Sequence, residues 1–199
     1  MSEEKETGTT MPGISLDLTP QAKIANTNAK LIKKILSLLK SVANEHASSG
    51  EHKGALIVLG EFVRSNYIIP GMRQIGTNPL MGKAIYINGS SKDTSIVIPL
   101  LSENADGAII IDSTGQIMAT QVYLHVEHAE AQVEEECSTR HISAASFSMN
   151  PHIIACFTLS EETSKVRYFA DGKQVNVYDP HEKKEDGTDD DDDDVELET

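Results

Sequence analysis

The sequence predicts an α/β fold, a single domain with a central mixed β-sheet flanked by helices. Residues 20–47 place apolar side chains at spacings of three and four, which indicates an amphipathic helix. Two compact apolar runs beside glycines, 54–60 and 107–112, are typical of buried strands. The Asp171-Gly172 pair between two strand-like runs predicts a hairpin. Helices and strands mixed in this order favour one central mixed sheet.

The first helix has a defined start and end. Thr19 can cap it, and Pro20 suits its first position because proline lacks an N–H that the first turn would leave unpaired. The run Ala47-Ser48-Ser49-Gly50 predicts its end.

The segments that follow the first strand give mixed signals, because proline and glycine pairs interrupt them. We expect turns or short helical pieces over 61–82, a short strand over 84–87, and either strand or helix over 95–102, where Pro99 weakens both. The second half is clearer and predicts strands over 107–112 and 116–126, a helix over 138–149, a strand over 152–159, and a hairpin of 166–170 with 174–178.

The two ends of the chain differ in composition from this central domain. Residues 1–18 lack periodicity and predict a disordered tail, and residues 19–178 form the domain. Residues 179–199 predict an acidic disordered tail, because its run of six consecutive aspartates repels itself and cannot bury a core. Most of the net charge of −14 lies in these tails, so the domain itself is nearly balanced.

Composition narrows the class of partners. No basic stripe stands out and aromatic residues make up 5% of the chain, which argues against a nucleic-acid partner. No apolar run approaches the roughly 20 residues that span a bilayer, so we expect no membrane contact. The acidic N-terminus is unlike a secretory signal, and Cys137 and Cys156 form no disulfide framework. We therefore expect a cytoplasmic protein.

Two short strings contain candidate chemistry. Asp106-Gly107-Ala108 opens an apolar strand, where a carboxylate beside a glycine leaves room for a cation and phosphate oxygens. An ordinary Asp-Gly turn has the same pattern. Ser138-Thr139-Arg140-His141 begins the predicted helix, where free N–H groups, a guanidinium and an imidazole suit an anion. A capped helix with a surface arginine and histidine is the alternative.

Further residues are less specific. Glu162 lies in the loop Ser160-Glu161-Glu162-Thr163 after a predicted strand, where a carboxylate can contact a metal or simply form a turn. The histidines have no zinc-site spacing, and the sequence has no phosphate-binding P-loop, no dinucleotide fingerprint and no nucleophile elbow.

Taken in order, six short stretches between residues 20 and 178 resemble the diadenylate cyclase domain. The acidic loop after residue 124 and the Ala144-Ala145 pair are closer to archaeal-type members than to bacterial membrane-anchored ones. The matching stretches are Gly54-Ala55-Leu56-Ile57-Val58, Gly76-Thr77-Asn78-Pro79-Leu80, Asp106-Gly107-Ala108-Ile109-Ile110-Ile111-Asp112, Tyr123-Leu124, Thr139-Arg140-His141-Ile142-Ser143-Ala144-Ala145, and Ser160-Glu161-Glu162 followed by Val166-Arg167 and Asp171-Gly172-Lys173.

The resemblance implies a nucleotidyltransferase that condenses two ATP into cyclic di-AMP and releases pyrophosphate. It implies Mg²⁺ or Mn²⁺ as cofactor, ATP as substrate and a face-to-face homodimer, because each domain offers one nucleotide site and the product has two halves. It implies catalytic roles for Asp106, Arg140 and His141, and metal contacts from Asp106 and Glu162. The implied nucleotide-binding residues are Gly107, Ala108, Tyr123, Leu124, Ser138, Thr139, Arg140 and His141.

Two positions depart from the bacterial pattern, which has glycine at the position of Ser138 and a second arginine at the position of Ile142. The loss of that arginine removes one phosphate contact. The alternative function is therefore a weak or inactive nucleotide-binding regulatory protein of the same fold, and an unrelated α/β domain is the third possibility.

Overall fold

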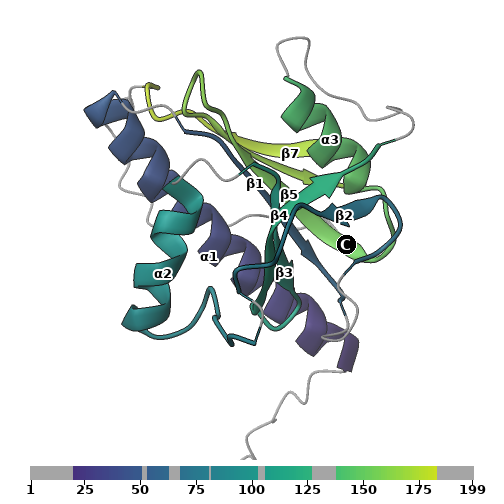
Figure 1. The fold of residues 1–199 in the computed structure, drawn as a ribbon. Coiled ribbons are helices and arrows are strands. Elements are labelled where there is room, and N and C mark those ends of the chain that lie inside the picture. Colours follow the sequence, from purple (N-terminus) through teal and green to yellow (C-terminus); the bar gives the residue numbers. More distant parts are fainter. Residues whose placement is uncertain are drawn as a thin grey trace, which may run out of the picture.

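The computed structural model in Figure 1 describes most of the predicted domain. The described residues are 20–50, 53–62, 68–80, 82–102, 106–126 and 138–182. Residues 1–19 and 183–199 lie outside them, so the cap at Thr19, the two tails and the domain limits stay predictions.

The described residues form a seven-stranded mixed sheet with the order β2-β4-β3-β1-β5-β6-β7. Strands β1 and β3 are parallel, and every other neighbouring pair is antiparallel. This arrangement confirms the predicted α/β fold with one central mixed sheet. The strands are β1 (Ala55–Gly60), β2 (Met72–Gln74), β3 (Ala108–Asp112), β4 (Ile117–Leu124), β5 (Ile153–Leu159), β6 (Val166–Ala170) and β7 (Lys173–Tyr178).

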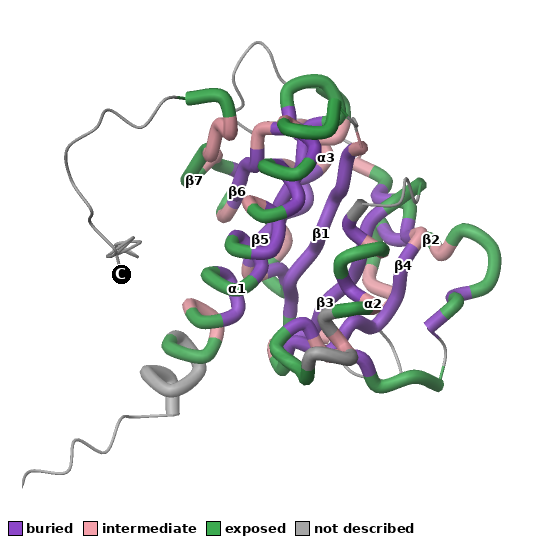
Figure 2. Tube along the Cα trace, turned by 90° about the vertical axis from the view of Figure 1, so that its left-hand side faces the viewer, coloured by how far each residue is buried: buried purple, intermediate pink, exposed green. Residues whose placement is uncertain are grey.

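Helices cover both faces of the sheet (Figure 1). The long α1 (Pro20–Ser49) and α2 (Ser91–Ser102) pack on one face, and α3 (Thr139–Phe147) packs on the other. Successive side chains of a strand point to opposite faces. Ile57 therefore joins the core beneath α1, whereas Val58 joins the core beneath α3. The central strands are buried along their whole length, as Figure 2 shows for β1 and β3.

Three segments correct or resolve the sequence predictions. The strand expected over 84–87 does not form, because this segment makes a single bridge between Tyr86 and Gln116. The ambiguous segment 95–102 belongs to helix α2, which tolerates Pro99 on its exposed side. Within 61–82 the short strand β2 pairs with β4, a long-range contact that local turn signals do not reveal.

The strand directions bring several loops to one edge of the sheet. Strands β1 and β3 begin at this edge, because they are parallel neighbours. Strands β4 and β5 end there, because they run antiparallel to β3 and β1. The residues at this edge are therefore Gly54, Gly107, Leu124 and Ser160, and the site described below lies along it.

Candidate functional site

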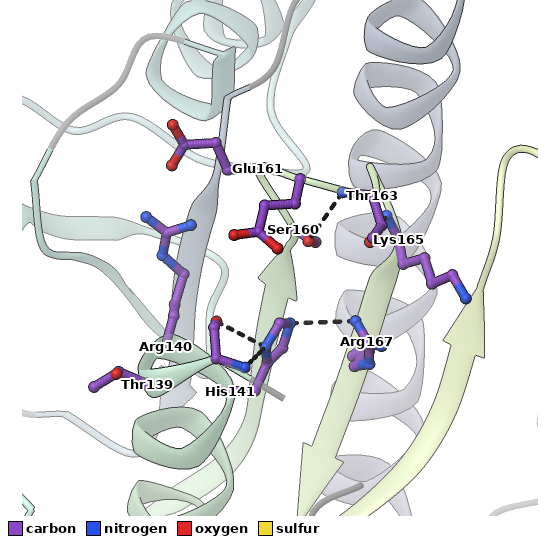
Figure 3. Close-up of a pocket in the computed structure, with 10 residues that line it drawn as sticks. Thr139, Arg140, His141, Ser160, Glu161, Thr163, Lys165 and Arg167 are labelled. Carbon is purple, nitrogen blue, oxygen red and sulfur yellow. Dashed lines mark hydrogen bonds between the residues drawn. The ribbon is translucent and has the colours of Figure 1, made fainter. Parts of the chain in front are cut away.

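A cavity of about 1000 Å³ opens between the start of α3 and the loop from β5 to β6 (Figure 3). Side chains from both elements line it, and both signs of charge are present. The lining residues are Ser138, Thr139, Arg140, His141, Ser160, Glu161, Glu162, Thr163, Lys165 and Arg167.

The first turn of α3 is held by its own histidine. Ser138 is the N-cap, with extended φ and ψ of −71° and 168°. Its backbone N–H donates to Nδ1 of His141 at 3.0 Å, the part that a glutamate plays in a capping box. The helix N-terminus that faces the cavity favours negative charge, because backbone N–H groups in the first turn have no partner inside the helix.

Arg140 lies against the start of strand β1. A Cβ atom at Gly54 would collide with the Arg140 guanidinium, so the arginine occupies the space that a side chain at Gly54 would fill. The glycine lets this guanidinium lie close to the backbone at the sheet edge. Gly54 begins the first of the six matching stretches, which implied no role for it.

His141 and Arg167 meet at the base of the cavity. Each residue is only 4% exposed, and the Nη1 atom of Arg167 lies 3.3 Å from Nε2 of His141 (Figure 3). The pKa of His141 is lowered from 6.5 to about 4, mainly because the imidazole is buried and to a smaller extent because the cations of Arg167 and Arg140 lie near it. His141 is therefore a neutral imidazole near pH 7.

The loop after β5 contributes exposed carboxylates. Glu161 and Glu162 are both exposed, and the Ser160 hydroxyl accepts the Thr163 N–H at 3.3 Å, which shapes the turn. Glu162 lines the cavity. Lys165 also lines it, but its Nζ lies 3.0 Å from a carboxylate oxygen of Asp179.

The Asp106-Gly107-Ala108 string lies at the same sheet edge but outside the lining of this cavity. Asp106 is exposed, and Ala108 is fully buried at the start of β3. Gly107 has a φ of +96°, and a Cβ there would lie 2.9 Å from the backbone of Gln121 and Val122. Only glycine fits this close approach. Strand β1 lies between β3 and β5. The Asp106-Gly107-Ala108 string, at the start of β3, and the glutamate loop, after the end of β5, therefore adjoin strands that are roughly 10 Å apart.

Tyr123 and Leu124 end strand β4 further along the edge. Tyr123 is 47% exposed, and Arg73 lies over its ring with 5.5 Å between the guanidinium carbon and the ring centroid. Arg73 and Tyr123 line a second cavity of about 380 Å³ with Gly71, Met72 and His125. Leu124 points to the opposite face and is buried in the core beneath α3.

The structure thus gathers the Ser138–His141 turn and Glu162 around one cavity. It places Asp106, Gly107 and Tyr123 along the same edge without bringing them into that cavity. Sequence reasoning missed two arginines, Arg73 and Arg167. The signal for Arg167 was a charged residue in the middle of the apolar run 166–169.

The two carboxylates that the sequence predicted as metal ligands, Asp106 and Glu162, are both exposed. Among the residues that the structure describes, no group of three or more His, Cys, Asp or Glu side chains gathers to hold a metal ion. Mg²⁺ is commonly held by one or two carboxylates together with substrate phosphates. The exposed carboxylates of Asp106 and Glu162 fit this mode.

None of the described helices is long and apolar enough for a membrane span.

Comparison with known proteins gives three further matches. A diadenylate cyclase from Haloferax volcanii is 26% identical over 133 residues, which cover 66% of this chain and 46% of that protein. The chain therefore spans less than half the length of this relative. The crystal structure of a double mutant of DacA from Staphylococcus aureus is 23% identical, with a TM-score of 0.47, over 78% of this chain and 89% of that one. A hypothetical membrane spanning protein from Bacillus cereus is 22% identical, with a TM-score of 0.46, over 70% of this chain and 60% of that one.

A family model covers most of the folded region. The model of the DAC family, described as DisA bacterial checkpoint controller nucleotide-binding, matches residues 42–174. This segment runs from the end of α1 into β7 and contains every candidate site residue. The match agrees with the resemblance that the sequence motifs indicated. The chain therefore belongs to the DAC family, the family of the diadenylate cyclases.

Proposed function

We propose that the protein is a diadenylate cyclase that condenses two ATP molecules into cyclic di-AMP and releases pyrophosphate. The observation that carries this proposal is the cavity at the start of α3. It combines a helix N-terminus, the Arg140 guanidinium and a neutral buried histidine, and a carboxylate loop faces them. Such a set suits a phosphate chain, because nucleotidyl transfer depends mainly on positioning and charge stabilisation.

We propose a separate role for each of the candidate residues along the sheet edge. Arg140 and the N–H groups of the α3 turn would bind the triphosphate. His141, neutral and fixed by Ser138, would donate a hydrogen bond to a phosphate oxygen from its Nε2 atom. Asp106 would accept the proton of the ribose 3′-hydroxyl as that oxygen attacks the α-phosphate of the second ATP, with pyrophosphate as the leaving group. Tyr123 would offer a ring face to adenine.

A divalent cation belongs to the same proposal. Asp106 and Glu162 would hold Mg²⁺ or Mn²⁺ together with phosphate oxygens, and the ion would neutralise charge that develops on the phosphates. The two carboxylates come from loops that flank strand β1 on either side.

The product requires two nucleotides, whereas one chain offers one set of phosphate-binding residues. Two chains facing each other about a two-fold axis would bring the two halves together. We therefore propose a homodimer in which each chain supplies one ATP.

The decisive experiment incubates the purified protein with ATP and Mn²⁺ or Mg²⁺ over a range of protein concentrations. We expect cyclic di-AMP and pyrophosphate, detected by mass spectrometry and a phosphate assay, with a specific activity that rises with protein concentration. ATP binding without product at every concentration would instead favour a regulatory nucleotide-binding protein.

A further inference from the structure

We propose that Arg167 binds the phosphate chain of the nucleotide directly, from strand β6 rather than from helix α3. This inference rests on the proposed function, since it names a further residue of the same site. The residue after His141 on the helix, Ile142, does not line the cavity, whereas Arg167 does. The second cation of this site would therefore come from a different element of the fold.

Arg167 is a buried cation without a counter-charge. It is 4% exposed, and no described residue forms an ion pair with it. Its Nε atom is buried and has no hydrogen-bond partner. Removing a guanidinium from water without a carboxylate partner is costly, so such a group is retained where a ligand supplies the missing negative charge.

The N–H groups that point at the His141 imidazole outnumber its acceptor nitrogens by one. The Ser138 N–H points at Nδ1 of the imidazole, and Nη1 of Arg167 points at Nε2. A neutral imidazole has one acceptor nitrogen, and the other nitrogen carries a proton. When Nδ1 accepts from Ser138, the Nε2–H and the Arg167 N–H groups are two donors side by side. An acceptor such as a phosphate oxygen satisfies both.

Strand β5, which lies beside Arg167, has a second buried polar atom without a hydrogen-bond partner. Thr158 of β5 is directly opposite Arg167 in the antiparallel register, and cross-strand partners share a face of the sheet. Its hydroxyl oxygen is also buried without a hydrogen-bond partner. Arg167, which lines the cavity, and Thr158, its cross-strand neighbour, are therefore two adjacent buried residues that each have a polar atom without a hydrogen-bond partner.

The test compares ATP binding and stability in the Arg167→Met variant. Methionine keeps much of the apolar volume and removes the charge. We expect the dissociation constants of ATP and of inorganic tripolyphosphate to rise at least about tenfold, as hydrogen bonds to charged groups require. We also expect the ligand-free variant to unfold at a higher temperature than the unsubstituted protein, because a buried unpaired cation is gone. Arg167→Lys, which keeps the charge but not the planar fork, should fall between the two.

A second variant separates direct binding from positioning of His141. In a His141→Gln background, Arg167→Met should still weaken ATP binding at least about tenfold. Loss of the effect in that background would show that Arg167 acts through His141 and would overturn the proposal. Unchanged ATP affinity in Arg167→Met alone would overturn the proposal as well. If Arg167→Met does not fold, unchanged ATP affinity in Arg167→Lys would overturn it.

The outcome is distinguishable from failure of the proposed function. ATP binding that depends on Arg167 without any cyclic di-AMP would support this inference and refute the cyclase activity. Cyclic di-AMP formation with ATP affinity independent of Arg167 would do the reverse.

Discussion

The two halves of the sheet edge are built differently. On the α3 side, His141 and Arg167 are buried and Arg140 lies against Gly54, so these three side chains are held by the packing around them. On the β3–β4 side, Asp106 and Tyr123 are exposed, and what is fixed there is the backbone around Gly107. The groups that we propose to bind phosphate are thus fixed by packing. The groups that we propose to bind the metal, the ribose and the adenine are exposed.

Because of this difference, we expect substitutions on the two sides to affect activity and folding differently. Changes on the open side should alter activity and leave folding intact, because exposed side chains contribute little to the core. Changes on the buried side should alter folding, its pH dependence and ligand affinity together.

Asp106→Asn should have the largest effect on the reaction. The amide cannot accept the ribose proton, so we expect product formation to fall by roughly 10²–10⁴-fold, the usual contribution of general base catalysis. The thermal midpoint should not change, because the side chain is exposed. Cyclic di-AMP formation and thermal unfolding measured on the same preparation check both parts. Retained activity would remove Asp106 from the mechanism.

His141 predicts the pH dependence of stability. Its pKa falls from 6.5 to about 4 on folding, mainly through burial, so between these pH values the unfolded chain binds a proton that the folded chain does not. Stability should therefore rise with pH from about 4 to 6.5, and the full span contributes up to about 3 kcal/mol. Urea unfolding at several pH values measures the slope.

The matched control for this slope is the exposed His152. His141→Gln should remove up to one proton from the slope between pH 5 and 6.5, whereas His152→Gln should leave the slope nearly as it is in the unsubstituted protein. Equal slopes in all three proteins would contradict a neutral, buried His141.

Arg140 and Gly54 should act as one unit on ATP affinity. Arg140→Ala removes charged hydrogen bonds to phosphate, which contribute about 1.5–3 kcal/mol, or roughly a factor of 10 to 150. Gly54→Ala should weaken binding in the same direction, because the new Cβ displaces the guanidinium.

The double variant provides the control for this pair. Since Gly54 acts through the arginine, Gly54→Ala should cost no further affinity once Arg140 is alanine. Calorimetric titration of ATP on the four proteins gives the coupling. Independent, additive losses would show that Gly54 affects binding by another route.

Much of this molecule could be predicted from local pattern. The apolar periodicity of α1, the buried runs of β1 and β3 and the Asp171-Gly172 hairpin depend on residues close in sequence, and the structure has all of them. The Ser138–His141 turn was recognised for the same reason. Its residues are consecutive, and a helix start gathers them.

The missing parts depend on contacts that local pattern does not record. Strand β2 forms only because β4 lies beside it, and segment 84–87 lacks a strand partner beyond one bridge. Arg167 looked like an ordinary strand residue until the antiparallel pairing of β5 and β6 placed it under α3. The separation of Asp106 from the main cavity likewise follows from strand order, which places β1 between β3 and β5.

Lys165 gives the smallest expected effect and the sharpest contrast with Arg140. Both residues line the same cavity, but the Lys165 ammonium is paired with Asp179 at 3.0 Å and points away from Arg140 in Figure 3. The two side chains are 31% and 22% exposed, so the pair contributes about 1 kcal/mol or less to stability. Lys165→Met should therefore change ATP affinity less than about twofold. A loss as large as that of Arg140→Ala would mean that the lysine leaves Asp179 for the phosphate, and the cationic side of the site would then include a mobile member.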